Sequence, residues 1–154
     1  MYRITANFYK DFFIYKDDDL IMVAKRRYNW FFGVTVKVYF LEDKLVITYK
    51  SISFFFTRIK IKYQNLPDEV MIVGSIWGNL CLKVSNHIIC CKFNSIPQRK
   101  MGKIEIDDKE VAKITNKKIF SSSLEFEIEF PEDNKLGIYC VLLFLMKISA
   151  VESF

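Results

Sequence analysis

The sequence predicts a mainly β protein in which short antiparallel strands form a closed barrel around one hydrophobic C-terminal helix. Three observations predict this fold class. Aromatic residues make up 16% of the 154 residues, and aromatic and β-branched side chains favour the pleated surface of a sheet. Apolar and polar residues alternate in many short runs that turn residues separate. The last stretch, residues 136–150, is instead apolar on every side.

The predicted strands follow one another at intervals of about 8–12 residues, which is typical of β-sandwiches and barrels. Polar turns separate them, including three consecutive aspartates at 17–19 and the acidic segment 107–110. Alternation is strict in 58–63, where the basic residues face one side and the apolar residues, Tyr63 included, face the other. The strand segments are 8–16, 20–24, 34–41, 45–50, 52–63, 70–73, 80–84, 87–93, 102–106, 111–114 and 124–130.

The apolar C-terminal stretch turns this set of strands into a barrel. A surface helix shows a polar face, whereas residues from Ile138 to Met146 are apolar all round. A single sheet covers one side of such a helix, and a closed barrel covers all of it. Fifteen residues span roughly 22 Å as a helix, whereas crossing a membrane takes about 20 apolar residues. We therefore predict one domain, residues 1–154, with a core helix at about 136–150.

The end of the chain resembles a known family. Residues 130–146, Phe-Pro-Glu-Asp-Asn-Lys followed by the apolar stretch, are similar to the terminal strand and central helix of the tubby C-terminal-like superfamily. That superfamily includes the tubby proteins, the phospholipid scramblases and the LURP-one-related proteins. Residues 103–114 resemble a hairpin in which these proteins carry an acid, a small polar turn, and then Val or Ala, Lys and Ile. The resemblance implies a barrel of about twelve strands around the helix, and a phosphoinositide head group as the ligand.

Basic residues supply the most concrete functional prediction. The chain carries a net charge of +5, which permits an anionic partner without requiring one. A basic tripeptide at 25–27 precedes the aromatic-rich segment 28–32, and a second basic row alternates along 58–62. Cations beside aromatics suit an anionic membrane surface, where each basic residue contributes about 1 kcal/mol. The sequence predicts an anionic phospholipid head-group site formed by Lys25, Arg26, Arg27, Arg58, Lys60 and Lys62. The alternative is a basic strand that faces solvent.

Other functions find weaker support in the residues. An alternative to lipid binding is a protein-interaction or structural role, with Trp30–Phe32 or Trp77 as the contact. An enzyme would need a pocket that brings the single histidine, His87, together with Glu or Cys. The sequence contains no Gly-rich phosphate loop and no nucleic-acid-binding pattern. We predict a non-enzymatic protein with no metal, no cofactor and no nucleic-acid partner.

Acidic residues raise two further alternatives. The aspartates at 17–19 offer oxygen ligands to Ca²⁺, but a Ca²⁺ loop spaces its ligands and usually contains Gly. We predict a solvated turn there. Glu125, Glu127 and Glu129 share one face of a strand about 7 Å apart. We expect them to pair with lysines of a neighbouring strand rather than to act as a catalytic pair.

The four cysteines bear on location. Cys81, Cys90, Cys91 and Cys140 lack both the CxxC spacing of metal sites and the density of a disulfide scaffold. We predict buried, reduced thiols, which suit a cytoplasmic protein. The first residues lack the apolar core of a signal peptide. The predicted location is therefore cytoplasmic, peripheral to a membrane if the lipid prediction holds.

Overall fold

Twelve strands and one α-helix make up the part of the chain that the computed structural model describes, residues 1–7, 10–29, 31, 33–53, 57–74, 80–93, 100–118 and 122–151. A short 3₁₀ turn, η1 (Leu41–Asp43), joins β4 to β5. The strands are β1 (Tyr2–Asn7), β2 (Phe12–Lys16), β3 (Asp19–Asn29), β4 (Gly33–Phe40), β5 (Lys44–Ser53), β6 (Thr57–Gln64), β7 (Val70–Val73), β8 (Leu80–Val84), β9 (His87–Phe93), β10 (Lys100–Ile106), β11 (Lys109–Asn116) and β12 (Ser123–Glu129), and the helix is α1 (Gly137–Val151).

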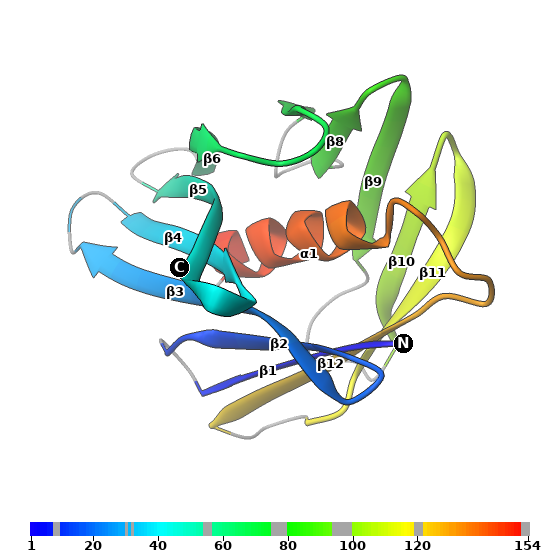
Figure 1. Cartoon of the computed structure of the whole chain (residues 1–154), viewed down its shortest axis with the longest axis horizontal. Coiled ribbons are helices and arrows are strands. Elements are labelled where there is room, and N and C mark those ends of the chain that lie inside the picture. The colour runs from blue at the N-terminus through cyan, green and yellow to red at the C-terminus, as the bar shows by residue number, and fades with distance from the viewer. Residues whose placement is uncertain are drawn as a thin grey trace.

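All the described strands belong to one antiparallel sheet, in the order β6-β5-β4-β3-β2-β1-β12-β11-β10-β9-β8-β7. Neighbours in the sheet are neighbours along the chain except at β1 and β12, which pair from Tyr2 opposite Ile128 to Asn7 opposite Ser123. The first and last strands therefore meet in the middle of the sheet. Figure 1 shows the strands curving into a nearly closed barrel. The prediction of a mainly β fold with one C-terminal helix is confirmed.

The barrel has a seam between β6 and β7, the two ends of the sheet order. Side chains hold one end of this seam together. The Gln64 side-chain amide donates to the Val70 carbonyl at 3.1 Å and accepts from the Val70 N–H at 2.8 Å. Next to it, the Tyr139 hydroxyl of α1 accepts from the Asp68 N–H at 3.0 Å. A side-chain clasp thus stands where a ladder of backbone hydrogen bonds would close a barrel.

The helix begins at Gly137, and most of its described side chains are buried. The Asn134 carbonyl and side-chain oxygens accept from the N–H groups of Gly137 and Leu136, at 3.0 and 2.9 Å. Every side chain from Tyr139 to Ser149 is buried. The helix contacts β5, β6, β8 and β9, and the ring of Phe144 meets that of Phe126 on β12 edge to face at 5.3 Å. No helix in the described ranges is long and apolar enough to cross a membrane.

Acidic residues form the tight hairpin turns, as the sequence predicts. Asp17 and Asp18 both have positive φ, at 48° and 72°, and Asp107 and Asp108 have φ of 50° and 65°. Two consecutive residues with positive φ are the requirement of a type I′ turn, and Asp tolerates that conformation better than most residues. Asp17 also accepts from the terminal amine of Met1 at 2.9 Å. This contact lowers the pKa of the Asp17 carboxyl.

The structure corrects three details of the predicted strands. Residues 2–7 form β1, which the sequence analysis did not count as a strand. The segment 52–63, predicted as one strand, is divided between the end of β5 and β6. Tyr63 lies on the basic face and is 45% exposed, not on the face of Ile61. The reason is a β-bulge where Thr48 pairs with Tyr63 and Tyr49 with Ile61, which leaves Lys62 as an extra residue and reverses the alternation.

Candidate anion-binding surface

The fold brings the two predicted basic clusters onto one surface. Strands β3, β4, β5 and β6 are consecutive in the sheet. Their register aligns Arg27 with Thr35, Thr35 with Lys50, and Lys50 with Lys60. Residues directly opposite each other in a ladder share a face of the sheet. With neighbouring strands about 4.8 Å apart, this row spans about 14 Å.

More cations flank this row on the same surface. Lys25 lies opposite Lys37, two pairs along the β3–β4 ladder from Arg27 and therefore on the same face. Arg58 pairs with Ile52 on the other side of the row, and Lys62 is exposed at the bulge. The residues that alternate with them, such as Val36 and Tyr49, are buried. We call the outward residues the β3–β6 basic surface; they are Lys25, Arg27, Lys37, Lys50, Arg58, Lys60 and Lys62.

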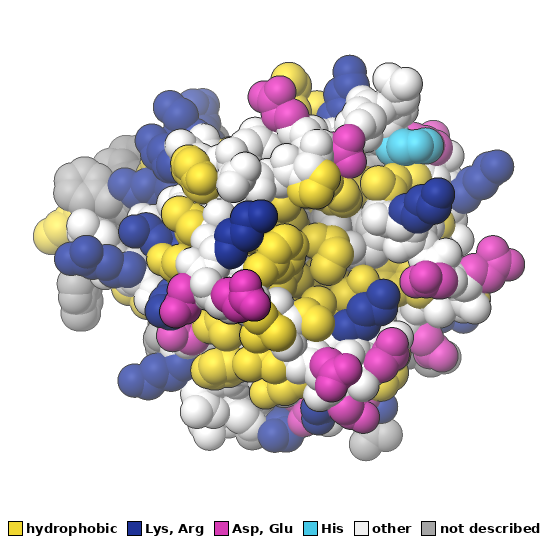
Figure 2. Space-filling model, in the orientation of Figure 1, with side chains coloured by type: hydrophobic (Ala, Val, Ile, Leu, Met, Phe, Trp, Pro, Cys, Tyr) yellow, Lys and Arg dark blue, Asp and Glu magenta, His cyan; other side chains and the backbone are white. Residues whose placement is uncertain are grey.

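Apart from Asp19, the first residue of β3, the strands of this surface carry no carboxylate. Residues 20–41 and 44–66 contain nine of the 23 Lys and Arg residues and no Asp or Glu. The rest of the chain contains the other 14 basic residues and all 18 acidic residues. Leaving Lys50 aside, the residues of the basic surface form no ion pair with the described residues. Lys25 has an aromatic neighbour, with its ammonium 5.0 Å from the centre of the Tyr39 ring. In Figure 2, Lys and Arg gather along the left of the view, the side of β3 to β6 in Figure 1.

Arg26 stands apart from the other five predicted residues. It alternates with Lys25 and Arg27 along β3, so its side chain points to the opposite face. Its guanidinium lies over the Phe12 ring, 3.9 Å from the centroid, and donates to the backbone oxygens of Asn7, at 3.1 Å, and of Lys10. Arg26 therefore fastens the connection between β1 and β2 and is not part of the basic surface.

Two lysines of the surface were missed by the sequence analysis. Lys37 is the single cation of β4, and Lys50 is separated from Lys44, the other cation of β5, by five apolar or neutral residues, so neither forms part of a cluster in the sequence. The signal was present in the period of two, because Lys37 occupies an outward position between Val36 and Val38, both buried. Their contribution becomes visible only when the strand order places them between β3 and β6.

The aromatic contacts proposed for this region are only partly described. Phe31, in the connection from β3 to β4, is 75% exposed. It lies next to the end of β3 that carries Arg27. Trp30, Phe32 and Trp77 lie outside the described residues. An exposed aromatic residue thus adjoins the basic surface.

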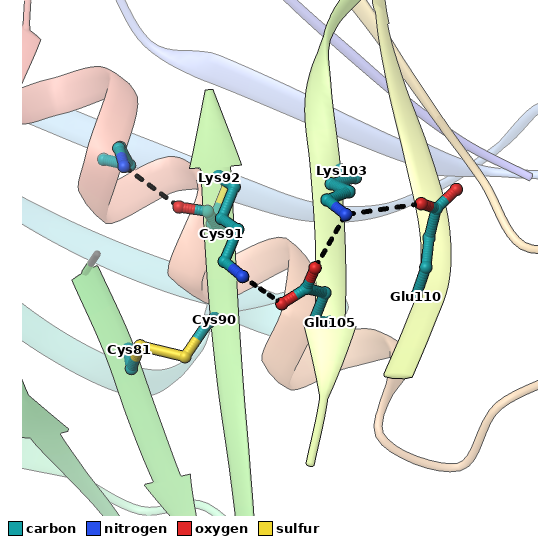
Figure 3. Close-up of polar contacts among 8 residues, drawn as sticks. Cys81, Cys90, Cys91, Lys92, Lys103, Glu105 and Glu110 are labelled. Carbon is teal, nitrogen blue, oxygen red and sulfur yellow. Dashed lines mark hydrogen bonds and ion pairs between the residues drawn. A yellow bond between two sulfur atoms is a disulfide. The ribbon is translucent and has the colours of Figure 1, made fainter. Parts of the chain in front are cut away.

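The outward acids of β10, β11 and β12 have close lysine partners, unlike the basic surface. Glu105 is 6% exposed and contacts Lys92 at 2.5 Å and Lys103 at 2.8 Å. Lys103 also reaches Glu110 at 3.7 Å. Figure 3 shows this chain of charges across β9, β10 and β11. Hydrogen bonds from Lys103 and Lys92 hold the pKa of the Glu105 carboxyl below its usual range.

Two of the three glutamates of β12 pair with lysines, as the sequence analysis expected, and Glu129 forms no ion pair with the described residues. Glu127 pairs with Lys117 at 2.8 Å, and Glu125 with Lys118 at 3.5 Å. Each is an ion pair with a lysine that follows β11, the neighbouring strand. Pairs of this kind contribute little to stability when exposed. These ion pairs do neutralise charge on the surface of β12 and of the residues that follow β11.

His87 has an acidic partner that the sequence did not suggest. Its Nδ1 lies 2.6 Å from Oδ2 of Asp107, whose Oδ1 accepts from the Ile88 N–H at 2.9 Å. The His87 hydrogen bond is the main cause of a lowered pKa at Asp107. A groove of about 470 Å³ beside the pair is lined by neither Glu nor Cys among the described residues. The pair fastens the β10–β11 turn to the start of β9. The described residues also contain no group of three or more His, Cys, Asp or Glu that could hold a metal ion.

The prediction of four reduced cysteines is wrong for two of them. Cys81 on β8 and Cys90 on β9 lie directly opposite each other and form a disulfide (Figure 3). Cys91 follows Cys90 immediately and therefore faces the core, where it and Cys140 are free and buried. Burial raises the pKa of each of these two thiols to about 12. The pairing depends on strand register, which the nine-residue separation in sequence does not reveal.

Comparison with models of known protein families, with curated proteins and with solved structures found no match for this chain.

Proposed function

We propose that this protein is a non-enzymatic binding module that docks its β3–β6 basic surface on anionic phospholipid head groups at a membrane surface. The observation that carries the proposal is the set of outward cations on β3, β4 and β6 that form no ion pair with the described residues. An unneutralised surface of one sign attracts an oppositely charged partner from a distance and aligns the protein as it binds.

The energy available from this surface is sufficient for membrane association. Each basic residue near an anionic membrane contributes about 1 kcal/mol, so that six such residues supply roughly 6 kcal/mol before the cost of immobilisation. Phe31 adds an apolar side chain of the kind that enters the boundary between head groups and acyl chains. Lys25 lies directly opposite Lys37, and Lys50 directly opposite Lys60, on neighbouring strands about 5 Å apart. Two cations of such a pair can therefore contact one multiply charged head group.

We also propose that the fold is of the tubby C-terminal-like kind, a closed barrel with the helix as its filling. The sheet order, the count of twelve described strands and the burial of α1 support this proposal. The location that we propose is cytoplasmic and peripheral to a membrane. The Cys81–Cys90 disulfide weighs against it, because disulfides persist mainly in oxidising compartments. Alkylation of thiols in intact cells, followed by mass spectrometry of the 80–93 peptide, decides between the two.

Vesicle binding tests the proposed function. We expect the protein to sediment with vesicles that contain phosphoinositide, less with phosphatidylserine vesicles, and not with neutral phosphatidylcholine. Binding should fall steeply between about 0.1 M and about 1 M salt, because the Debye length falls from about 10 Å to about 3 Å. An absence of binding to phosphoinositide vesicles at low salt would refute the proposal.

A matched pair of variants locates the surface. The triple variant Lys25→Glu/Arg27→Glu/Lys37→Glu should lose vesicle binding. The control Lys109→Glu/Lys113→Glu/Lys135→Glu changes net charge by the same amount on exposed residues outside the basic surface, and it should keep most of the binding. Equal losses in the two variants would show that only net charge matters and that no specific surface is used. Circular dichroism of both variants checks that the fold is intact.

A further inference from the structure

At the seam of the barrel, none of the described strands pairs with the outer edge of β6. β6 pairs with β5 along its length, from Gln64 opposite Ile47 to Thr57 opposite Ser53. On its other edge, the described residues contribute only the side-chain clasp between Gln64 and Val70. In Figure 1, β6 and the β8–β9 hairpin lie on the upper side of the view, toward the two ends of the sheet order. An edge of this kind presents a row of backbone N–H and C=O groups that can pair with another chain.

The side chains beside this edge select the kind of chain that fits. Three basic residues are exposed along β6, namely Arg58, Lys60 and Lys62. Lys83 is exposed on β8, on the other side of the seam. Two large apolar side chains flank the clasp, Tyr63 at 45% and Met71 at 59% exposure. Lysines on an edge strand prevent pairing with neutral or basic strands. The same lysines favour an incoming strand that carries carboxylates.

We propose that the open edge of β6 binds an acidic, extended segment of a partner protein, which adds to the sheet as a further strand. Main-chain hydrogen bonds supply the affinity in this mode of recognition, and alternate side chains supply the specificity. Carboxylates at every second position of the segment would face the cations of β6 on the outer surface. Apolar residues near the clasp would cover Tyr63 and Met71. This partner is distinct from the lipid surface, and its site is the edge of the sheet rather than its face.

Backbone methylation separates strand addition from simple charge attraction. The probe is a fluorescent peptide that alternates Glu with Val and matches the eight residues of β6 in length. Two derivatives of this peptide carry N-methyl groups on alternate backbone nitrogens. In one derivative the methyl groups lie along one edge of the strand, and in the other they lie along the opposite edge. The two derivatives have identical charge. We expect one derivative to bind as tightly as the parent and the other at least roughly tenfold more weakly, because each lost backbone hydrogen bond costs about a factor of two to ten. Equal affinities of the two derivatives, or no binding of the parent at low salt, would overturn the proposal.

Two measurements on the protein locate the site. Hydrogen exchange of residues 57–64 should slow when the peptide is added, while exchange in β1, which is paired on both edges, should not change. Lys60→Glu/Lys62→Glu should weaken peptide binding at least roughly tenfold, whereas Lys109→Glu/Lys113→Glu should leave it within a factor of about two. Unchanged exchange in 57–64 at saturating peptide would place the peptide elsewhere and refute the assignment.

The variants also keep this proposal separate from lipid binding. Lys25→Glu/Arg27→Glu/Lys37→Glu removes cations from β3 and β4 and should weaken vesicle binding while peptide binding continues. If the wild-type protein does not bind vesicles but shows an edge-dependent response to N-methylation, the lipid proposal is refuted and strand addition is supported. Vesicle binding without any edge-dependent peptide binding would refute strand addition and support the lipid proposal.

Discussion

The β3–β6 half and the β9–β12 half of this protein are built alike and charged differently. Both consist of antiparallel strands whose inward residues are apolar and whose outward residues include several lysines. In the β9–β12 half, Lys92 and Lys103 contact Glu105, and the lysines after β11 contact β12. In the β3–β6 half the only acidic residue on the strands is Asp19, the first residue of β3. A net charge of +5 conceals this separation, because it averages the basic β3–β6 half with the rest of the chain, in which acids outnumber bases.

The difference in charge pairing indicates which surface is the better candidate for binding. Paired charges on a sheet surface neutralise one another and give the surface no strong attraction for an ion or a membrane. Unpaired cations repel one another, which costs stability that the pairing of charges would recover. A surface that carries this cost is a better candidate for binding than a surface whose charges are balanced.

The largest expected effect comes from the core that both halves share. α1 contacts β5 and β6 of the β3–β6 half and β9 of the β9–β12 half, so Leu143→Asp should unfold both halves together. A buried, unpaired carboxylate costs more than about 4 kcal/mol, and Leu143→Met should cost less than about 1.5 kcal/mol. Urea unfolding followed by circular dichroism measures both variants. A soluble, folded protein after deletion of residues 136–154 would contradict the role of the helix.

Reduction of the disulfide should affect the two halves unequally. Cys81 and Cys90 join β8 to β9 and close a loop of nine residues in sequence separation. Removal of a disulfide around a loop of this size costs about 2–3 kcal/mol. We expect Cys81→Ser/Cys90→Ser to speed hydrogen exchange in residues 80–93 and to leave residues 20–53 nearly unchanged. Uniformly faster exchange along the chain would mean that the two halves unfold as one unit.

Lys147 carries a charge inside the core and gives a pH-dependent test. It is 7% exposed, and its ammonium donates to the Cys91 carbonyl at 2.9 Å. Burial lowers the pKa of Lys147, so the unfolded chain binds more protons than the folded chain between that lowered value and about 10.4. Stability should therefore rise with pH in this window.

Lys147→Met removes the titrating group and should abolish that rise, with a change in stability at neutral pH on the order of 1 kcal/mol. Urea unfolding at about pH 7 and about pH 10 compares the two proteins. An identical pH slope in the wild type and the variant would show that Lys147 does not titrate differently on folding.

The smallest effect concerns the paired half alone. The pKa of Glu105 is lowered by Lys103 and Lys92, so its contribution is present above the unfolded value of about 4.3 and is lost as pH falls through the folded value. Glu105→Gln should be less stable than the wild type near neutral pH and lose less stability on acidification. Thermal unfolding across about pH 2–6 covers this window. No Glu lies on β3, β4, β5 or β6. Lys60→Gln should therefore not change how stability falls as the pH is lowered.

Local pattern was sufficient for much of the fold. The period of two, the acidic hairpin turns and the all-round apolar helix are properties of neighbouring residues, and each was predictable before any contact was known. The exceptions are local failures of the same rule. β1 was overlooked although Tyr2, Ile4 and Ala6 alternate with polar residues, and the bulge at Lys62 moved Tyr63 to the other face.

What the sequence by itself determined is therefore the class of fold and the identity of outward and inward residues on most strands, because strand periodicity is a property of the backbone. The tertiary structure alone decided which outward residues meet. Strand order placed Lys37 and Lys50 between the two predicted basic clusters, and register paired Cys81 with Cys90 rather than with Cys91. It also left β6 at the edge of an open seam. These contacts join residues that are distant in sequence, and no local pattern encodes the order in which strands assemble.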